Sequence, residues 1–135
     1  MPPLNVEHLA WNASDAVAMA AWYVEHLGMR IVRRMDTAPH VHFLADASGR
    51  VVIEIYTSPL DPVPAYATMH PIRFHLAFAA EDPDAAKAAL LQAGATFVDE
   101  QHLPDGSRLV MLRDPWGLAV QLCKRARPLL PALQV

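Results

Sequence analysis

The sequence contains a single cysteine, Cys123, among its 135 residues. One thiol cannot form an internal disulfide or a cysteine-rich zinc site, so any metal must be held by histidine, carboxylate or amide groups. Basic runs are also scarce, because 11 Lys and Arg stand against 14 Asp and Glu, for a formal net charge of −3. The first basic cluster is at 124–127, near the end of the chain. We therefore expect no nucleic-acid partner.

Long apolar runs are missing as well. No stretch reaches the ~18 residues that a membrane span needs, and residues 1–5 lack the basic and apolar regions of a signal peptide. We therefore expect a soluble, cytoplasmic protein that has no membrane partner. The length of 135 residues suits one compact domain, or equally two half-size modules that share a core.

What the sequence does contain is an internal repeat. The motif His-Leu-Ala-aromatic occurs at His8–Trp11 and again 67 positions later (75 − 8), at His75–Phe78. The same offset (121 − 54) relates Glu54 to Gln121, each a polar residue in an otherwise apolar stretch. A turn-forming tetrapeptide precedes each of these polar residues, with a slip of one position, at 46–49 and 114–117. The chain is therefore predicted to consist of two copies of one structural unit.

Each half has the pattern of four strands and one helix. In the first half, alternation of apolar and polar residues predicts strands at 6–12, 29–36, 40–46 and 50–57, with a helix between a Ser14 cap and Gly28. In the second half, strands are predicted at 72–78, 96–102, 107–113 and 118–123, with a helix that starts at Asp82-Pro83 and ends at 93–94. A four-stranded sheet covered by one helix leaves its other face open. The predicted fold is α+β, with two tandem βαβββ modules whose sheets form a shared cup-like cleft.

We interpret residues 1–135 as a single domain built from these two modules. The first module covers about 4–57 and the second about 72–123. Four prolines in 58–71 predict an extended linker between them. The Pro/Leu-rich tail, 124–135, is expected to dock on a neighbouring surface.

Strand alternation also predicts which polar side chains face the open side of each sheet. Those placed there are His8, Asn12, Glu54, Tyr56, Arg73, His75 and Gln121. His42 alternates with Phe43 and is interpreted as a cavity or a surface residue. Arg73 suits a substrate carboxylate or, alternatively, is a solvated strand end. Cys123 shares the face of Gln121 and is expected to be a small buried strand residue.

These features together resemble the vicinal oxygen chelate superfamily, which contains glyoxalase I, bleomycin-resistance proteins, fosfomycin-resistance thiol transferases and extradiol dioxygenases. The resemblance covers Val6 to Cys123. It rests on the two His-Leu-Ala strands, on Trp22-Tyr23 followed by Leu27-Gly28-Met29, and on Asp114-Pro115-Trp116-Gly117 leading to Gln121. In that family, paired βαβββ units form a cup, and metal ligands come from the first and last strands of each unit.

The resemblance implies one divalent ion held by His8, Glu54, His75 and Gln121. Such a donor set suits Fe, Mn, Co, Ni or Zn and does not choose among them. The family usually has glutamate where this chain has Gln121, and an amide can ligate through its oxygen but cannot accept a proton. Glu54 is then the only carboxylate in the set and the candidate catalytic base.

The function that the resemblance implies is that of a metal-dependent lyase or isomerase of glyoxalase type. It would act on a small oxygen-chelating substrate through an enolate-like intermediate. The residues expected to bind that substrate are Arg73, Tyr56, His42 and Asn12. The resemblance also implies a homodimer, and the apolar residues of the tail, 128–133, favour one because they need cover.

Two other functions remain open. Two histidines and one carboxylate also form the facial triad of a non-haem Fe(II) ring-cleaving dioxygenase, although the dioxygenases take their carboxylate from the position of Gln121. A non-catalytic ligand-binding protein of bleomycin-resistance type would hold a planar molecule without any metal. The cleft is predicted to form either within one chain or between two chains that exchange modules through the linker at 58–71.

Overall fold

The computed structural model describes residues 1–50 and 52–130. The chain divides into two compact units, which we call module 1, Met1–Pro64, and module 2, which begins at Ala65. The division falls inside the stretch predicted to be a linker. Neither helix in the described part of the chain has the length and apolar composition that crossing a membrane requires.

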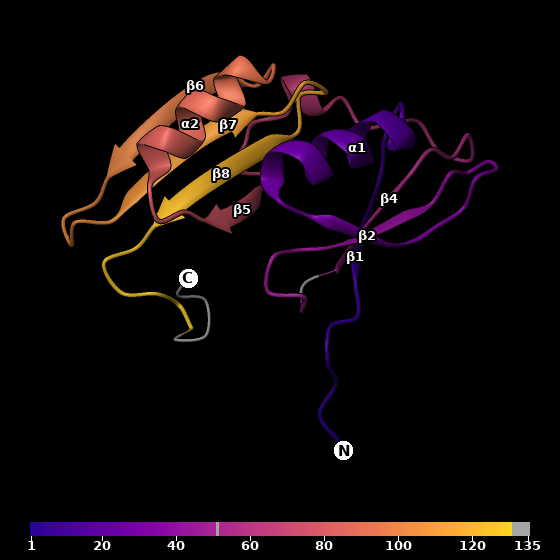
Figure 1. Ribbon diagram of the computed structural model, residues 1–135, viewed down its shortest axis with the longest axis horizontal. Helices are drawn as coiled ribbons and strands as arrows, with labels where there is room; N and C mark the ends of the chain where they lie inside the picture. Colours follow the sequence, from indigo (N-terminus) through magenta and orange to yellow (C-terminus); the bar gives the residue numbers. More distant parts are fainter. Residues whose placement is uncertain (51, 131–135) are drawn as a thin grey trace. The chain divides into compact units, whose positions relative to one another are not determined.

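Module 1 is one sheet and one helix. Its elements in chain order are β1 (Leu9–Asn12), α1 (Ala16–Leu27), β2 (Arg30–Arg34), β3 (His42–Ala45) and β4 (Val52–Tyr56). The strand order in the sheet is β1-β4-β3-β2, with β1 parallel to β4 and the other pairs antiparallel. Helix α1 packs on β2, β3 and β4 (Figure 1).

Module 2 repeats this arrangement. Its elements are the short 3-10 helix η1 (Tyr66–Thr68), β5 (Leu76–Ala79), α2 (Pro83–Gln92), β6 (Thr96–His102), β7 (Arg108–Arg113) and β8 (Ala119–Lys124). The strand order is β5-β8-β7-β6, and α2 packs on β7 and β8 (Figure 1). The prediction of an α+β fold with two tandem βαβββ modules is confirmed. The largest differences are that β1 begins at Leu9 rather than at residue 6, that β5 begins at Leu76 rather than at residue 72, and that η1 lies in the stretch predicted to be extended.

The internal repeat of the sequence is also present in the pairing register of the strands. Ala10 pairs with Glu54 across β1 and β4, and Ala77 pairs with Gln121 across β5 and β8. Both pairs are parallel and keep the 67-residue offset. The two modules therefore place equivalent residues at equivalent points of their sheets.

The turns before β4 and β8 are also equivalent. Asp46 accepts a backbone hydrogen bond from Ser48 at 3.0 Å, and Asp114 accepts one from Trp116 at 2.9 Å. Each turn ends at a glycine with a left-handed backbone, φ 73° at Gly49 and 89° at Gly117, where a residue with a Cβ would be strained. The resemblance between the two tetrapeptides is thus structural as well as chemical.

Both helices begin at an aspartate cap. The Asp15 carboxylate accepts from the backbone N–H of Ala18 at 3.0 Å, and the Asp82 carboxylate accepts from that of Ala85 at 3.0 Å. The prediction of Asp82 is confirmed, whereas the prediction of Ser14 is wrong by one residue. Because Asp15 and Asp82 are also 67 positions apart (82 − 15), the repeat itself pointed to the correct cap.

The core of each module lies between its sheet and its helix. Its side chains, all no more than 3% exposed, are Met19, Tyr23, Leu44, Ile53 and Ile55 in module 1 and Leu90, Val110, Leu112, Val120 and Leu122 in module 2. Burying a side chain of this size stabilises the fold by about 1.5–3 kcal/mol. Most apolar side chains of the inner strands lie on the helix side, while Phe43 and Met111 lie with Glu54 and Gln121 on the opposite face.

Side chains fasten the two ends of the predicted linker to their own modules. In module 1 the Asn12 amide donates to the carbonyls of Ser58 and Asp61 at 3.1 and 3.0 Å. In module 2 the Arg113 guanidinium donates to the carbonyls of Tyr66 and Met69, both at 2.8 Å. The connection between the modules is therefore reduced to residues 62–65.

The tail docks on module 2, as far as the structure describes it. The backbone N–H of Ala126 donates to the buried hydroxyl of Ser107 at 2.9 Å. The rest of the predicted apolar tail, 131–135, lies outside the described residues, as does Val51.

Candidate functional site

Module 1 brings His8 and Glu54 together. Glu54 lies in β4 and pairs with Ala10, and His8, two residues before Ala10, falls on the same face. The His8 Nε2 atom is 3.5 Å from Glu54 Oε1. Both side chains are partly shielded from solvent, with 33% and 18% of their surface exposed. The ring of Phe43 meets the His8 ring edge to face, with the centroids 5.5 Å apart.

The other nitrogen of His8 is engaged by a carboxylate. His8 Nδ1 lies 2.9 Å from Glu7 Oε1, so in the neutral ring Nδ1–H donates a hydrogen bond to the Glu7 carboxylate. The lone pair then resides on Nε2, the atom that faces Glu54. Metal-ligating histidines have this arrangement, in which one nitrogen is held by a carboxylate or carbonyl and the other is free to ligate.

His75 in module 2 also has a hydrogen bond at its Nδ1 atom. Its Nδ1 donates to the carbonyl of Pro71 at 2.9 Å, which leaves the lone pair on Nε2. Gln121 lies in β8, paired with Ala77, and its Oε1 accepts a hydrogen bond from the Cys123 thiol at 3.4 Å. Burial raises the pKa of that thiol, so Cys123 serves as a donor rather than as a nucleophilic thiolate.

Each module therefore supplies two donors of the predicted ligand set. Module 1 offers an imidazole and a carboxylate, and module 2 offers an imidazole and an amide oxygen. Among residues 1–50 and 52–130, no three His, Cys, Asp or Glu side chains form a cluster poised for a metal. These four donors fit a divalent ion of intermediate hardness in their chemistry, and the complete four-donor site stays a prediction.

The structure gives two of the predicted substrate-binding residues other roles. Asn12 is buried, and its amide is occupied by the backbone at Ser58 and Asp61. His42 is 4% exposed and pairs with Ile55, so it lies on the helix-covered face, opposite Glu54. The prediction that His42 is a cavity or surface residue is wrong. Its burial is tolerated because Nδ1 lies 2.6 Å from the carbonyl oxygen of His40 and is hydrogen-bonded to it.

The other two predicted substrate-binding residues are accessible. Tyr56 is half-buried in β4 and shares the face of Glu54, two positions away. Arg73 is exposed in the turn that precedes β5, because that strand begins at Leu76 rather than at residue 72. Their roles toward a substrate stay predictions.

The structure adds residues that the sequence analysis missed. The strand register continues each proposed ligand position into a row across the open face of the sheet. In module 1 the row is Ala10, Glu54, Phe43 and Arg33, and in module 2 it is Ala77, Gln121, Met111 and Asp99. The rows are equivalent, but the offset is 68 between Phe43 and Met111 (111 − 43) and 66 between Arg33 and Asp99 (99 − 33). A search for one constant offset misses them, although a search that tolerated a slip of one residue finds them.

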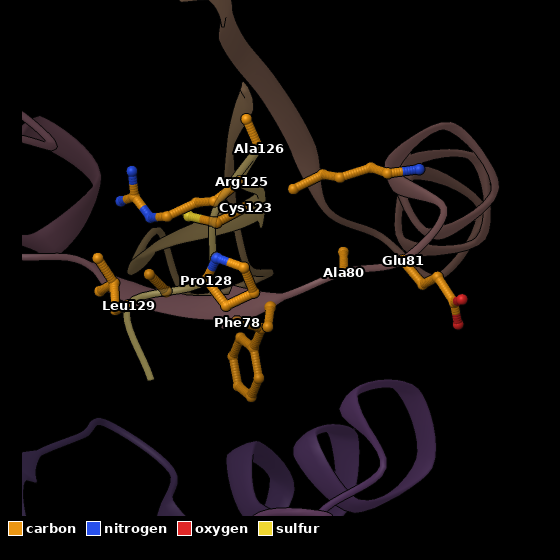
Figure 2. Close-up of a pocket in the computed structure, with 11 residues that line it drawn as sticks. Phe78, Ala80, Glu81, Cys123, Arg125, Ala126, Pro128 and Leu129 are labelled. Atoms are coloured by element: carbon orange, nitrogen blue, oxygen red, sulfur yellow. The ribbon is translucent and has the colours of Figure 1, made fainter. Parts of the chain in front are cut away.

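A cavity of about 450 Å³ lies in module 2, beside β5 and the end of β8. Its lining residues are Ala77, Phe78, Ala79, Ala80, Glu81, Cys123, Lys124, Arg125, Ala126, Pro128 and Leu129. Figure 2 shows Arg125 extending toward Leu129, with Glu81 at the opposite end. The volume lies within the range of small-molecule pockets. None of the four proposed metal donors lines the cavity. Cys123 does line it, and the Cys123 thiol donates a hydrogen bond to Gln121 Oε1.

Comparison with known proteins decides the family. The model of the Glyoxalase/Bleomycin resistance protein/Dioxygenase superfamily matches residues 5–122. The chain belongs to this superfamily. That range covers both modules of the glyoxalase-type fold and all four proposed donors. No curated protein matches the sequence.

Solved structures of the glyoxalase superfamily share the fold. A glyoxalase family protein from Bacillus cereus is 16% identical, with a TM-score of 0.75 over 91% of this chain and 95% of its own. Lactoylglutathione lyase from Agrobacterium tumefaciens is 22% identical, with a TM-score of 0.64 over 91% and 95%. An antibiotic binding protein from Streptomyces sp. CB03234 is 20% identical, with a TM-score of 0.69 over 90% and 96%. An enzyme and a binding protein thus share this scaffold, so the fold does not select between the two functions.

Proposed function

We propose that this superfamily member is a metal-dependent lyase or isomerase of glyoxalase type, acting on a small substrate with adjacent oxygens. The observation that supports it most is the pair of prepared imidazoles. His8 and His75 occupy equivalent positions, each has Nδ1 hydrogen-bonded to an oxygen, and in the neutral ring each has its lone pair on Nε2. The accepting oxygens differ, being the Glu7 carboxylate for His8 and the Pro71 carbonyl for His75. A carboxylate beside one and an amide beside the other complete the donor set.

In this proposal His8, Glu54, His75 and Gln121 hold one divalent ion, which is Fe, Mn, Co, Ni or Zn. When bound, the ion supplies Lewis-acid polarisation of the adjacent substrate oxygens. Glu54 is the proton acceptor, because Gln121 cannot take a proton. Its carboxylate removes a proton from the carbon next to the substrate carbonyl, which gives an enolate-like intermediate, and returns it to the neighbouring carbon. Phe43, packed against His8, shields this transfer from water.

A ligand-binding function is the second candidate, and the cavity in module 2 is the observation that favours it. Its walls are largely alanine side chains with Phe78, Pro128 and Leu129. Such a pocket accepts an apolar molecule without any metal. The antibiotic binding protein with the same fold is a precedent for that use. The two candidates differ in one measurable property, which is whether the protein holds a stoichiometric metal ion.

We further propose that the open faces of the two modules form the shared cleft, and that the protein is a cytoplasmic homodimer. The cleft is assembled within one chain or by exchange of modules between two chains. Edge strands β1, β2, β5 and β6 and the apolar tail both gain cover in a dimer.

Metal analysis of protein purified without an affinity tag tests the proposed function. We expect His8→Ala and His75→Ala each to abolish stoichiometric metal binding while the circular dichroism spectrum is unchanged, because neither side chain belongs to a core. His102→Ala is the matched control, since its side chain is 68% exposed on β6 outside the proposed site. Full metal content in either variant removes that residue from the donor set. Wild-type protein that takes up no divalent ion contradicts the enzyme and favours the ligand-binding candidate.

A further inference from the structure

The row across the open face of module 1 runs from a proposed metal ligand to a cation. We infer that Arg33 binds an anionic group of the substrate, and that Phe43 lies beneath the apolar body joining this group to the chelating oxygens. The inference rests on the proposed function and narrows it to anionic substrates. It assigns a recognition role to residues outside the donor set.

The strand register establishes the geometry. Glu54 pairs with Phe43 across β4 and β3, and Phe43 pairs with Arg33 across β3 and β2. Residues that pair directly across strands have their side chains on the same face. Two strand spacings separate Glu54 from Arg33, or about 10 Å along the sheet. A small molecule that chelates an ion at Glu54 therefore reaches Arg33 when it extends across Phe43.

The chain provides an internal contrast in the next residue. Arg34 pairs with His42, on the other face, and its Nε lies 3.3 Å from Asp36 Oδ1. Arg33 is exposed, and within the described residues no carboxylate forms an ion pair with it. The register irregularity between Ile31 and Arg33 is what brings Arg33 opposite Phe43. Arg33 is thus a free guanidinium on the open face, suited to two-pronged binding of a carboxylate or phosphate.

Phe43 provides the surface between the two polar ends. Its ring contacts the His8 ring, so it lies next to the proposed donors. An aromatic side chain in that place favours an apolar or aromatic body over a hydrated one. The row therefore selects a substrate with adjacent oxygens at one end, an apolar middle and an anionic group at the other end.

The equivalent row of module 2 has the opposite character. Met111 takes the place of Phe43, and the exposed Asp99 takes the place of Arg33. A carboxylate there repels an anion. The row of module 2 is therefore unsuited to an anionic group, whereas that of module 1 is suited to one.

Two hydroxamates test the inference on the metal-loaded protein, because hydroxamates chelate through adjacent oxygens. We expect 4-carboxybenzohydroxamate to bind about threefold more tightly than benzohydroxamate, as a two-pronged ion pair with the exposed Arg33 allows. Arg33→Gln should bring this ratio to about one without changing metal content or benzohydroxamate affinity, Arg33→Lys should retain part of it, and Arg34→Gln, the matched control, should retain all of it. Equal binding of the two hydroxamates by wild type, or an unchanged ratio in Arg33→Gln, overturns the inference.

A metal-free arm separates this inference from the proposed function. If the wild type takes up no metal, the proposed function fails, and nuclear magnetic resonance titrations with benzoate and benzamide then decide the role of Arg33. Shifts of the Arg33 and Phe43 signals by benzoate, absent with benzamide and in Arg33→Gln, support an anion site. Equal responses to both probes, or none, overturn it. Phenylphosphonate in the same titration shows whether the preferred anion is a phosphate or a carboxylate.

Discussion

The two modules have the same helix caps and the same turns, but the side chains on their open faces differ. Asp15 and Asp82 cap the helices in the same way, and the turns ending at Gly49 and Gly117 have the same hydrogen bonds. The open faces, by contrast, differ at corresponding positions. Glu54, Phe43 and Arg33 lie in module 1, where module 2 has Gln121, Met111 and Asp99. Caps and turns satisfy backbone groups that have no other partner, so they are fixed by the fold. Open-face side chains lie away from the helix-covered side of each sheet, so the packing of the helices constrains them less.

The helices are also held differently. In module 1, α1 packs through aromatic rings, with Trp22 and Trp11 on either side of the buried Tyr23 at centroid distances of 5.7 and 6.2 Å. In module 2, Arg108 on β7 binds both Asp84 on α2 and Glu100 on β6. Aromatic packing holds the helix of module 1, whereas ion pairs of Arg108 also hold the helix of module 2. We therefore expect the two modules to respond differently to substitutions and to pH.

The largest difference should appear at the matched turn glycines. A Cβ at Gly117 would lie 2.6 Å from the Cα of Ala67 in η1, whereas a Cβ at Gly49 would meet nothing closer than Arg30 Nη2 at 3.7 Å. We expect Gly117→Ala to lower the free energy of unfolding by about 3 kcal/mol or more, because strain and a backbone clash add. Gly49→Ala should cost about 1–2 kcal/mol, from strain alone. Urea unfolding followed by circular dichroism measures both, and equal costs would contradict the close approach of η1.

A smaller effect should follow from making the two proposed half-sites alike. Gln121→Glu gives module 2 the carboxylate of module 1, so divalent-metal affinity should rise by about tenfold. It also adds a second proton acceptor, and activity on the hemithioacetal of methylglyoxal and glutathione should appear or increase. The reverse change, Glu54→Gln, should weaken metal binding and lower any such activity by about 10²–10⁴-fold.

Competition with a chelating indicator separates the possible results of this exchange. If Gln121→Glu binds metal no more tightly than wild type, Gln121 is not at the metal and the four-donor set is wrong. If binding tightens while the hemithioacetal remains unreactive, the donor set is supported and the glyoxalase-type reaction is not.

The smallest effect concerns acid. The Arg108 guanidinium, hydrogen-bonded to both carboxylates, holds the pKa of Asp84 below its usual 3.8 and that of Glu100 below its usual 4.5. The unfolded chain therefore binds these protons more readily, so the stabilisation is fully present above the usual pKa values and is lost as the pH falls through the lowered ones. Hydrogen exchange should show α2 losing protection between about pH 5 and pH 3 by more than α1 does. Arg108→Gln should remove this difference, and an equal loss in both helices of the wild type would contradict it.

Much of the fold was predictable because the same sequence pattern occurs in both halves of the chain. The 67-residue offset located both outer strand pairs, and strand alternation placed Glu54 and Gln121 on the open faces. Ser14 and Asp15 are adjacent residues of two types that both cap helices, and only the repeat distinguishes them. The start of β1 was misplaced because Val6, an apolar residue in the right phase, is 88% exposed and has no partner strand. Alternation alone cannot reveal where pairing ends.

The site was less predictable for two physical reasons. His42 and Phe43 were assigned by polarity, yet the histidine is buried through a backbone hydrogen bond and the phenylalanine faces outward against His8. Arg33 was missed because a bulge shifts the register by one residue, and such irregularities leave no reliable mark on the sequence. Of the proposed donors, Glu54 and Gln121 lie on β4 and β8, which pair without such irregularities, whereas His8 and His75 lie just before β1 and β5.

The anchoring of the linker by Asn12 and Arg113 turns it into a short hinge. Of the four residues left between the anchored ends, Pro62 and Pro64 have their φ angles fixed by the pyrrolidine ring, and Val63 is further restricted because it precedes a proline. Only a few backbone torsions therefore remain free in this connection. In the proposed four-donor centre, lengthening this hinge would alter the effective concentration of one half-site for the other, and with it the metal affinity, without altering any ligand.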